Sequence, residues 1–139
     1  MSNINNSGVR DYSSNRAFGN GLGAASAVSV ITVVNADDAD FTPVPNAIHA
    51  ITPTAARTLT LLQATASKSN LRLGEGFVFY IKNNSAGAFS VTLVAGGGVQ
   101  VTTEGTSTLV VAQGETGAFV LSRTSESVHS LSCIGISSH

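Results

Sequence analysis

Large apolar side chains alternate with smaller or polar ones through residues 76–94. Because successive side chains of a strand point to opposite faces, this alternation predicts two strands that each carry three large apolar groups on one side. The polar residues 83–87 between them favour a tight turn, since asparagine, serine and glycine cap turns and tolerate positive φ. We therefore expect a β-hairpin whose single apolar face carries Phe77, Phe79, Ile81, Phe89, Val91 and Leu93.

The rest of the chain from Ala27 onward repeats short segments rich in β-branched residues, with turn signals about every ten residues. Residues 36–40 interrupt this pattern, and Pro43 and Pro45 oppose a central strand there. Residues 63–73 lack strand alternation and have room for one helical turn, but no segment sustains a helical period. The spacing is typical of a single antiparallel β-sandwich of about eight or nine strands. Beyond the hairpin, the expected strands are 28–34, 47–51, 57–62, 99–102, 107–112, 118–123 and 128–136.

The expected core follows from the shared parity of apolar residues on these strands. The strand 118–123 adds two inward positions to the six of the hairpin. Cys133 alternates with Leu131, so its thiol is expected to face inward as a small apolar filler. The predicted core residues are Phe77, Phe79, Ile81, Phe89, Val91, Leu93, Phe119 and Leu121.

Residues 1–26 differ from the domain expected over residues 27–139. They show no periodicity and contain glycine-rich stretches, a composition that buries too little apolar surface to order by itself. Two interpretations stay open: a disordered terminus, or an extended arm that orders against a neighbouring subunit. In the second case the contact residues are aromatic, apolar and arginine side chains, namely Val9, Arg10, Tyr12, Arg16 and Phe18.

Only 11% of the 139 residues are charged, and the net charge is −1. The seven basic residues are scattered, which argues against a nucleic-acid partner because that function needs clustered lysine and arginine. No apolar run is long enough to cross a membrane, and no secretory signal pattern is visible, so we expect synthesis in the cytoplasm. So little charge favours surfaces that meet other protein, because few charged groups must be desolvated on contact.

No motif predicts an enzyme, a cofactor or a metal. The histidines His49, His129 and His139 lack the spacing of zinc ligands. The acidic group of Asp37, Asp38 and Asp40 lacks the glycine-bearing loop and distal glutamate of a calcium site, so we interpret it as a solvated turn. The glycines at 96–98 are not followed by the lysine of a phosphate loop, and no nucleophilic serine has a base placed beside it.

Three stretches carry a resemblance to a known group of proteins. They are residues 54–61, residues 74–87 with the order glycine, aromatic strand and Asn83-Asn84-Ser85-Ala86-Gly87, and residues 91–99 with Val-Thr-Leu before a glycine run. This order resembles the small β-sandwich proteins of tailed phages and large DNA viruses, found among capsid decoration, head-fibre and minor capsid components. The resemblance covers residues 52–136 and implies a jelly-roll-like sandwich that assembles as a trimer on the virion surface.

Two functions are therefore expected. The first is a structural virion protein, a decoration or cement subunit whose partners are further copies of itself and the major capsid protein or other virion subunits. The alternative is a receptor- or carbohydrate-binding module such as a fibre head. Tyr12 and Tyr80 are its only aromatic candidates, because the chain has no tryptophan and most phenylalanines are assigned to the core. An exposed Tyr80 beside Lys82 would favour the binding module, whereas a Tyr80 packed under a subunit interface would favour the structural protein.

A homo-oligomer is also expected from the strands themselves, and the resemblance implies that it is a trimer. Segments 28–34 and 107–112 are apolar on both parities, so both of their faces need cover. A two-layer sandwich covers only one face of each sheet, and a neighbouring subunit can cover the other.

Overall fold

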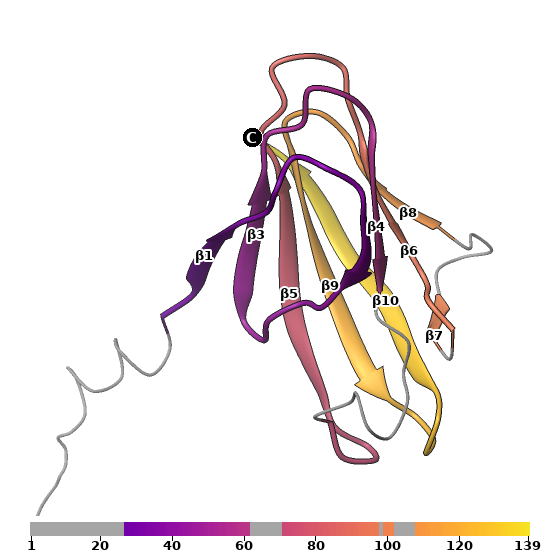
Figure 1. The fold of residues 1–139 in the computed structure, drawn as a ribbon. Coiled ribbons are helices and arrows are strands. Elements are labelled where there is room, and N and C mark those ends of the chain that lie inside the picture. The colour runs from indigo at the N-terminus through magenta and orange to yellow at the C-terminus, as the bar shows by residue number, and fades with distance from the viewer. Residues whose placement is uncertain (1–26, 62–70, 98, 102–107) are drawn as a thin grey trace, which may run out of the picture.

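The computed structural model describes residues 27–61, 71–97, 99–101 and 108–139. These residues form two β-sheets that face each other, without a helix among them (Figure 1). The prediction of an all-β, sandwich-like fold is confirmed. The N-terminal arm and most of the helical turn expected at 63–73 lie outside the described residues.

Ten strands make up the described fold. The large sheet has the order β1-β3-β5-β9-β10-β7, and the small sheet has the order β2-β4-β6-β8. The strands are β1 (Ser29–Thr32), β2 (Asp38–Phe41), β3 (Ala47–Ile51), β4 (Arg57–Leu61), β5 (Gly76–Asn83), β6 (Val91–Val94), β7 (Val99–Val101), β8 (Thr108–Val111), β9 (Glu115–Arg123) and β10 (His129–Ser138).

The chain crosses from one sheet to the other after every strand from β1 to β8, and only β9 and β10 follow each other in one sheet. β1, β3 and β5 lie side by side and run parallel (Figure 1). β2, β4 and β6 do the same in the small sheet, whereas β8 joins β6 antiparallel. Five strand pairs are parallel and three are antiparallel. The prediction of an antiparallel sandwich was therefore wrong, and this strand order does not confirm a jelly roll, which pairs its strands antiparallel.

The expected hairpin is a connection between the two sheets. β5 pairs with β3 and β9, whereas β6 pairs with β4 and β8. Residues 84–90 form the crossing, so the apolar sides of the two strands meet across the sandwich and not within one sheet. The alternation assigned the inward sides correctly but carried no information on which strands pair.

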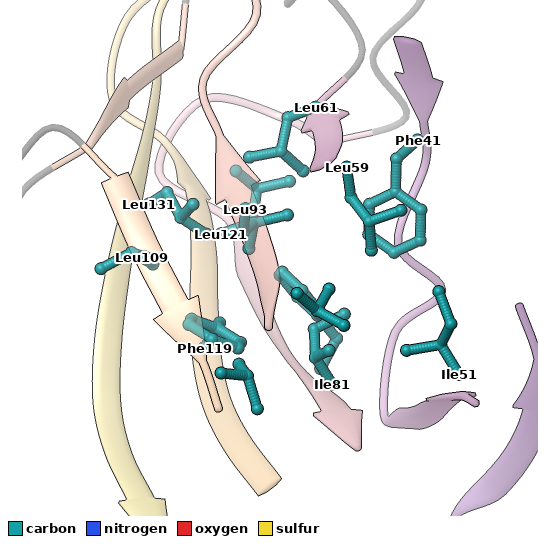
Figure 2. Packing of buried hydrophobic residues seen from close by; sticks show 13 residues of the cluster. Phe41, Ile51, Leu59, Leu61, Ile81, Leu93, Leu109, Phe119, Leu121 and Leu131 are labelled. Carbon is teal, nitrogen blue, oxygen red and sulfur yellow. The ribbon is translucent and has the colours of Figure 1, made fainter. Parts of the chain in front are cut away.

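The core lies between the sheets, where apolar side chains from both layers interdigitate (Figure 2). Phe79, Ile81, Val91, Leu93, Phe119 and Leu121 are buried there, and Phe77 packs against them while partly exposed. The rings of Phe79 and Phe119 stack with their centroids 5.5 Å apart. Gly117 leaves the room for this stack, since a Cβ at that position would lie 2.7 Å from Cζ of Phe119.

Phe89 is a correction to the predicted core, because it is 36% exposed. It precedes β6 and belongs to the crossing, so the strand parity that assigned it inward does not apply. Its amide donates to the carbonyl of Gly87 at 2.7 Å. Its ring lies against Gly87, where an added Cβ would come within 2.7 Å of Cε2. Phe89 therefore covers the crossing from outside.

β2 was missed in the sequence, where residues 36–40 were interpreted as an interruption. It forms an edge of the small sheet and pairs only with β4, with an irregular register between Asp38 and Phe41. An edge strand tolerates the nearby Pro43 and Pro45, because only one side needs backbone donors. Most other expected strands lie within a few residues of the observed ones.

Candidate interaction surface

The outer face of the large sheet is mainly apolar. The ladder places Val30, Ile48, Tyr80 and Ala118 side by side across β1, β3, β5 and β9. Val78 and Val120 form the neighbouring cross-strand pair. In β3, β5 and β9 these side chains alternate with buried ones, which assigns them to the face away from the small sheet. We call these six residues the outer apolar face.

Charge is sparse around the outer apolar face. Lys82 is the only charged residue at an outward position of β3, β5 and β9, and its cross-strand neighbours are Ala50 and Thr116. A surface with this composition loses few charge–water contacts when other protein covers it.

The outer face of the small sheet has a different character. Thr58 and Thr92 are cross-strand neighbours at its outward positions, and Val110 on β8 follows Thr92. Thr60 occupies the next outward position of β4. Hydroxyl groups keep this layer compatible with water, so the two outer faces of the sandwich are not equivalent.

The sequence-based reasoning found this surface only in part. Segments 28–34 and 107–112 were recognised as apolar on both parities. The outward positions Ile48, Val78, Ala118 and Val120 were not recognised as part of an apolar surface. The signal was present: residues 77–81 and 118–121 are also apolar at consecutive positions. The proposed arm contacts Val9, Arg10, Tyr12, Arg16 and Phe18 lie outside the described residues.

His49 is a buried structural residue of β3. Its Nε2 accepts a hydrogen bond from the Val44 amide at 3.0 Å, and its Nδ1 lies 3.1 Å from the carbonyl oxygen of Tyr80. A neutral ring with its proton on Nδ1 satisfies both partners. Phe41 and Phe79 meet the ring edge-on. Burial lowers the pKa of His49, although the hydrogen bond to Tyr80 acts in the opposite direction. Both ring nitrogens are used internally, so His49 has no lone pair for a ligand.

We expect the protein to lose stability as the pH falls below about 6.5, the ordinary histidine pKa. Burial lowers the pKa of His49, and burial with the nearby Arg123 charge lowers that of His129. The unfolded chain then binds more protons than the folded one, so the free energy of unfolding decreases from pH 6.5 down to the folded-state pKa values.

Chemical denaturation between pH 7.5 and 5.5 measures this slope. The His49→Gln variant should show a flatter profile than the wild type, whereas Ile134→Gln, at a position that is 60% exposed, removes no titratable group and should keep the wild-type slope. A wild-type profile that rises toward pH 5.5 would contradict the assignment of neutral, buried histidines.

A buried polar network anchors the crossing from β5 to β6. Nδ2 of Asn83 donates to the carbonyl oxygens of Phe89 at 2.8 Å and Val111 at 3.0 Å. Oδ1 of Asn83 accepts from the Ser85 amide at 2.9 Å. The Ser85 hydroxyl lies 3.1 Å from the Pro53 carbonyl oxygen and 2.8 Å from that of Gly87. The Asn-Asn-Ser-Ala-Gly motif is therefore structural in this fold.

Further polar side chains join neighbouring crossings. Oδ1 of Asn35 accepts from Nε of Arg57 at 2.9 Å, and Oδ1 of Asp37 accepts from the Thr58 amide at 2.9 Å. Oδ1 of Asp38 accepts from the Asp40 amide, as a turn aspartate does. Within the described ranges, no three histidine, cysteine, aspartate or glutamate side chains gather as metal ligands.

Arg123 joins loops at the end of the sandwich opposite the Asn83 network. Its guanidinium donates to the carbonyl oxygens of Leu71, Ser125 and Glu126.

His129 is buried at the start of β10, and Cys133 is partly buried against the core. In the described part of the chain, no helix has the length and hydropathy needed to span a membrane.

Comparison with known proteins gives no relative from which a function could be transferred. No family model, curated protein or solved structure matches the chain.

Proposed function

We propose that the chain is a structural virion protein, a decoration or cement subunit that binds the particle surface as a homotrimer and stabilises it. The observation that carries this proposal is the outer apolar face, where six residues on four adjoining strands meet with Lys82 as the nearest charged strand residue. Contiguous apolar surface of this kind marks a site of contact with other protein.

Two further features support the proposal. Several polar side chains of the described residues are engaged in holding crossings together, as Asn83, Ser85, His49 and Arg57 are. The order of motifs resembles small virion sandwiches. The proposal uses the two facing sheets and not a jelly-roll connectivity, because most strand pairs are parallel.

In this proposal the outer apolar face lies against the capsid, and residues 1–26 act as an extended arm that reaches a neighbouring capsid subunit. The arm contributes Val9, Tyr12 and Phe18 as apolar anchors. Repetition over a lattice compensates for a weak individual contact through multivalency.

Sedimentation with particles tests this assignment. Particles of the virus that encodes the chain, prepared without it, should bind the wild-type protein. Val120→Lys should reduce the bound fraction at least tenfold, because it places an ammonium group within the apolar contact. Thr92→Lys is the matched control, since Thr92 is an outward residue of the small sheet with similar partial exposure. Circular dichroism should show both variants folded.

The same assay separates the arm from the face. A chain lacking residues 2–24 should keep the sandwich and bind particles more weakly. Equal binding by the wild type and Val120→Lys would remove the outer apolar face from the proposed attachment, and equal binding by the truncated chain would remove the arm.

A receptor- or carbohydrate-binding fibre module is the alternative. Tyr80 and Lys82 favour it, because both occupy outward positions of β5. Tyr80 is only partly exposed between Ile48 and Ala118. Saccharide binding that Tyr80→Ala abolishes, with no binding to particles, would select this alternative.

A further inference from the structure

Among the described residues, the large sheet ends on two edges that have no further strand beside them. β1 pairs there with β3 alone, so within the described part of the chain its other side has no strand partner. At the opposite margin, the described residues of β7 pair with β10 from His129 to Leu131. Within the described part of the chain, Gly135–Ser138 of β10 have β9 as their only strand partner. The bulge between Cys133 and Gly135 interrupts that pairing, and the regular part of the free edge is Gly135–Ser138.

Neither edge carries the usual protection against pairing. Edge strands are commonly blocked by lysine, other charges or proline. Residues 27–35 and 130–138 contain no charged residue and no proline. Their apolar side chains are exposed, with Val30 at 70% and Ile136 at 43%.

The edge of the small sheet formed by β2 shows the contrast. It carries Asp38 and Asp40, has an irregular register and is followed by two prolines. The chain therefore protects the β2 edge by a familiar device, and no such device lies on the two margins of the large sheet among the described residues.

We propose that β1 of one copy pairs with Gly135–Ser138 of a second copy, so that the large sheet continues from subunit to subunit. This inference rests on the proposed homo-oligomer and identifies the strand pair that forms the interface between its subunits, which we call the seam. The partner is a second copy because the two free segments are margins of the same sheet and each spans four residues.

The strand directions agree with this seam. β1, β3 and β5 run parallel, and the two antiparallel pairs that follow return β10 to the direction of β1. A neighbouring copy that continues the sheet therefore brings β1 and β10 together as a parallel pair. Because the contact joins two different edges, it is heterologous and closes into a ring when the rotation between subunits allows. A ring of three is the expected homotrimer.

A charge-swap experiment tests the seam. Val30 and Ser137 lie on the same outer side of the sheet, since Val30 is the neighbour of Ile48 and Ser137 is the neighbour of Thr116. Val30→Lys should convert the oligomer to a monomer of 14.1 kDa in light scattering at micromolar concentration. Leu73→Lys is the control, since Leu73 is 65% exposed and lies outside the strands.

The double variants give the decisive comparison. Val30→Lys with Ser137→Glu should restore the oligomer, because opposite charges then meet at every seam, whereas Val30→Lys with Ser137→Lys should stay monomeric. A monomeric wild type, an unchanged mass for Val30→Lys, or no recovery in the Lys–Glu variant would overturn the seam. Failure of the Lys–Glu variant to recover the oligomer would point to pairing of β1 with β1 in a two-fold dimer.

Particle binding is measured separately, through Val120→Lys. An assembled protein that never binds particles would contradict the virion function while leaving the seam intact.

Discussion

Replacing Phe79 with alanine is expected to lower the free energy of unfolding by about 3–5 kcal/mol, the range for truncating a buried aromatic residue. Phe79 is fully buried at the centre of β5. Its ring stacks on Phe119 and meets His49 edge-on, with centroids 5.9 Å apart for the second pair. Truncation removes these contacts and leaves a cavity that the two sheets cannot easily close.

Urea unfolding followed by circular dichroism measures this loss. Phe89→Ala is the matched control, because the same side chain is truncated at a position that is 36% exposed, and its loss should be much smaller. If Phe79→Ala leaves too little folded protein, Phe79→Leu provides a milder truncation at the same site. Equal losses for Phe79→Ala and Phe89→Ala would contradict the observed division between core and crossing.

Replacing Asn83 with aspartate is expected to lower the free energy of unfolding by about 3–5 kcal/mol at neutral pH, the range for leaving an uncompensated buried charge. The substitution keeps the shape of the side chain but replaces its donor by an acceptor. The carbonyl oxygens of Phe89 and Val111 would then face a carboxylate in place of the amide that donates to them. Asn83 is fully buried, so water cannot replace the lost donors without opening the crossing.

Asn84→Asp is the control for this prediction, since the neighbouring asparagine is exposed. It makes the same chemical change one residue away and should alter stability little. The loss caused by Asn83→Asp should also diminish at acidic pH, where protonation removes the buried charge. Similar stability of the two variants at neutral pH would show that the Asn83 network does not hold the crossing.

The sequence predicted the inward sides of the strands well because alternation is a local property. Phe79 and Phe119 required no knowledge of the partner strand, and both are buried. The pairing of strands was not predictable in the same way. A turn such as residues 83–87 is compatible with a hairpin or with a crossing to a facing sheet, and the choice depends on contacts with β3 and β9 that lie far away in sequence.

The interaction surface was predicted only where one strand showed it. Val30 was recognisable because residues 28–34 carry apolar side chains on both parities. Ile48, Val78 and Val120 became a surface only when β3, β5 and β9 were placed side by side. Val78 lies between Phe77 and Phe79 and faces outward. The alternation that assigned the two phenylalanines to the core gave no sign that Val78 belongs to a second apolar face.

The protein content of purified virions tests the virion assignment most directly. Under the proposed function, quantitative mass spectrometry of purified virions should detect the chain at a copy number in fixed proportion to the major capsid protein. Its signal should persist through washing at moderate salt, because the proposed contact is apolar and contains little charge. A chain that is abundant in infected cells but missing from purified particles would contradict the assignment.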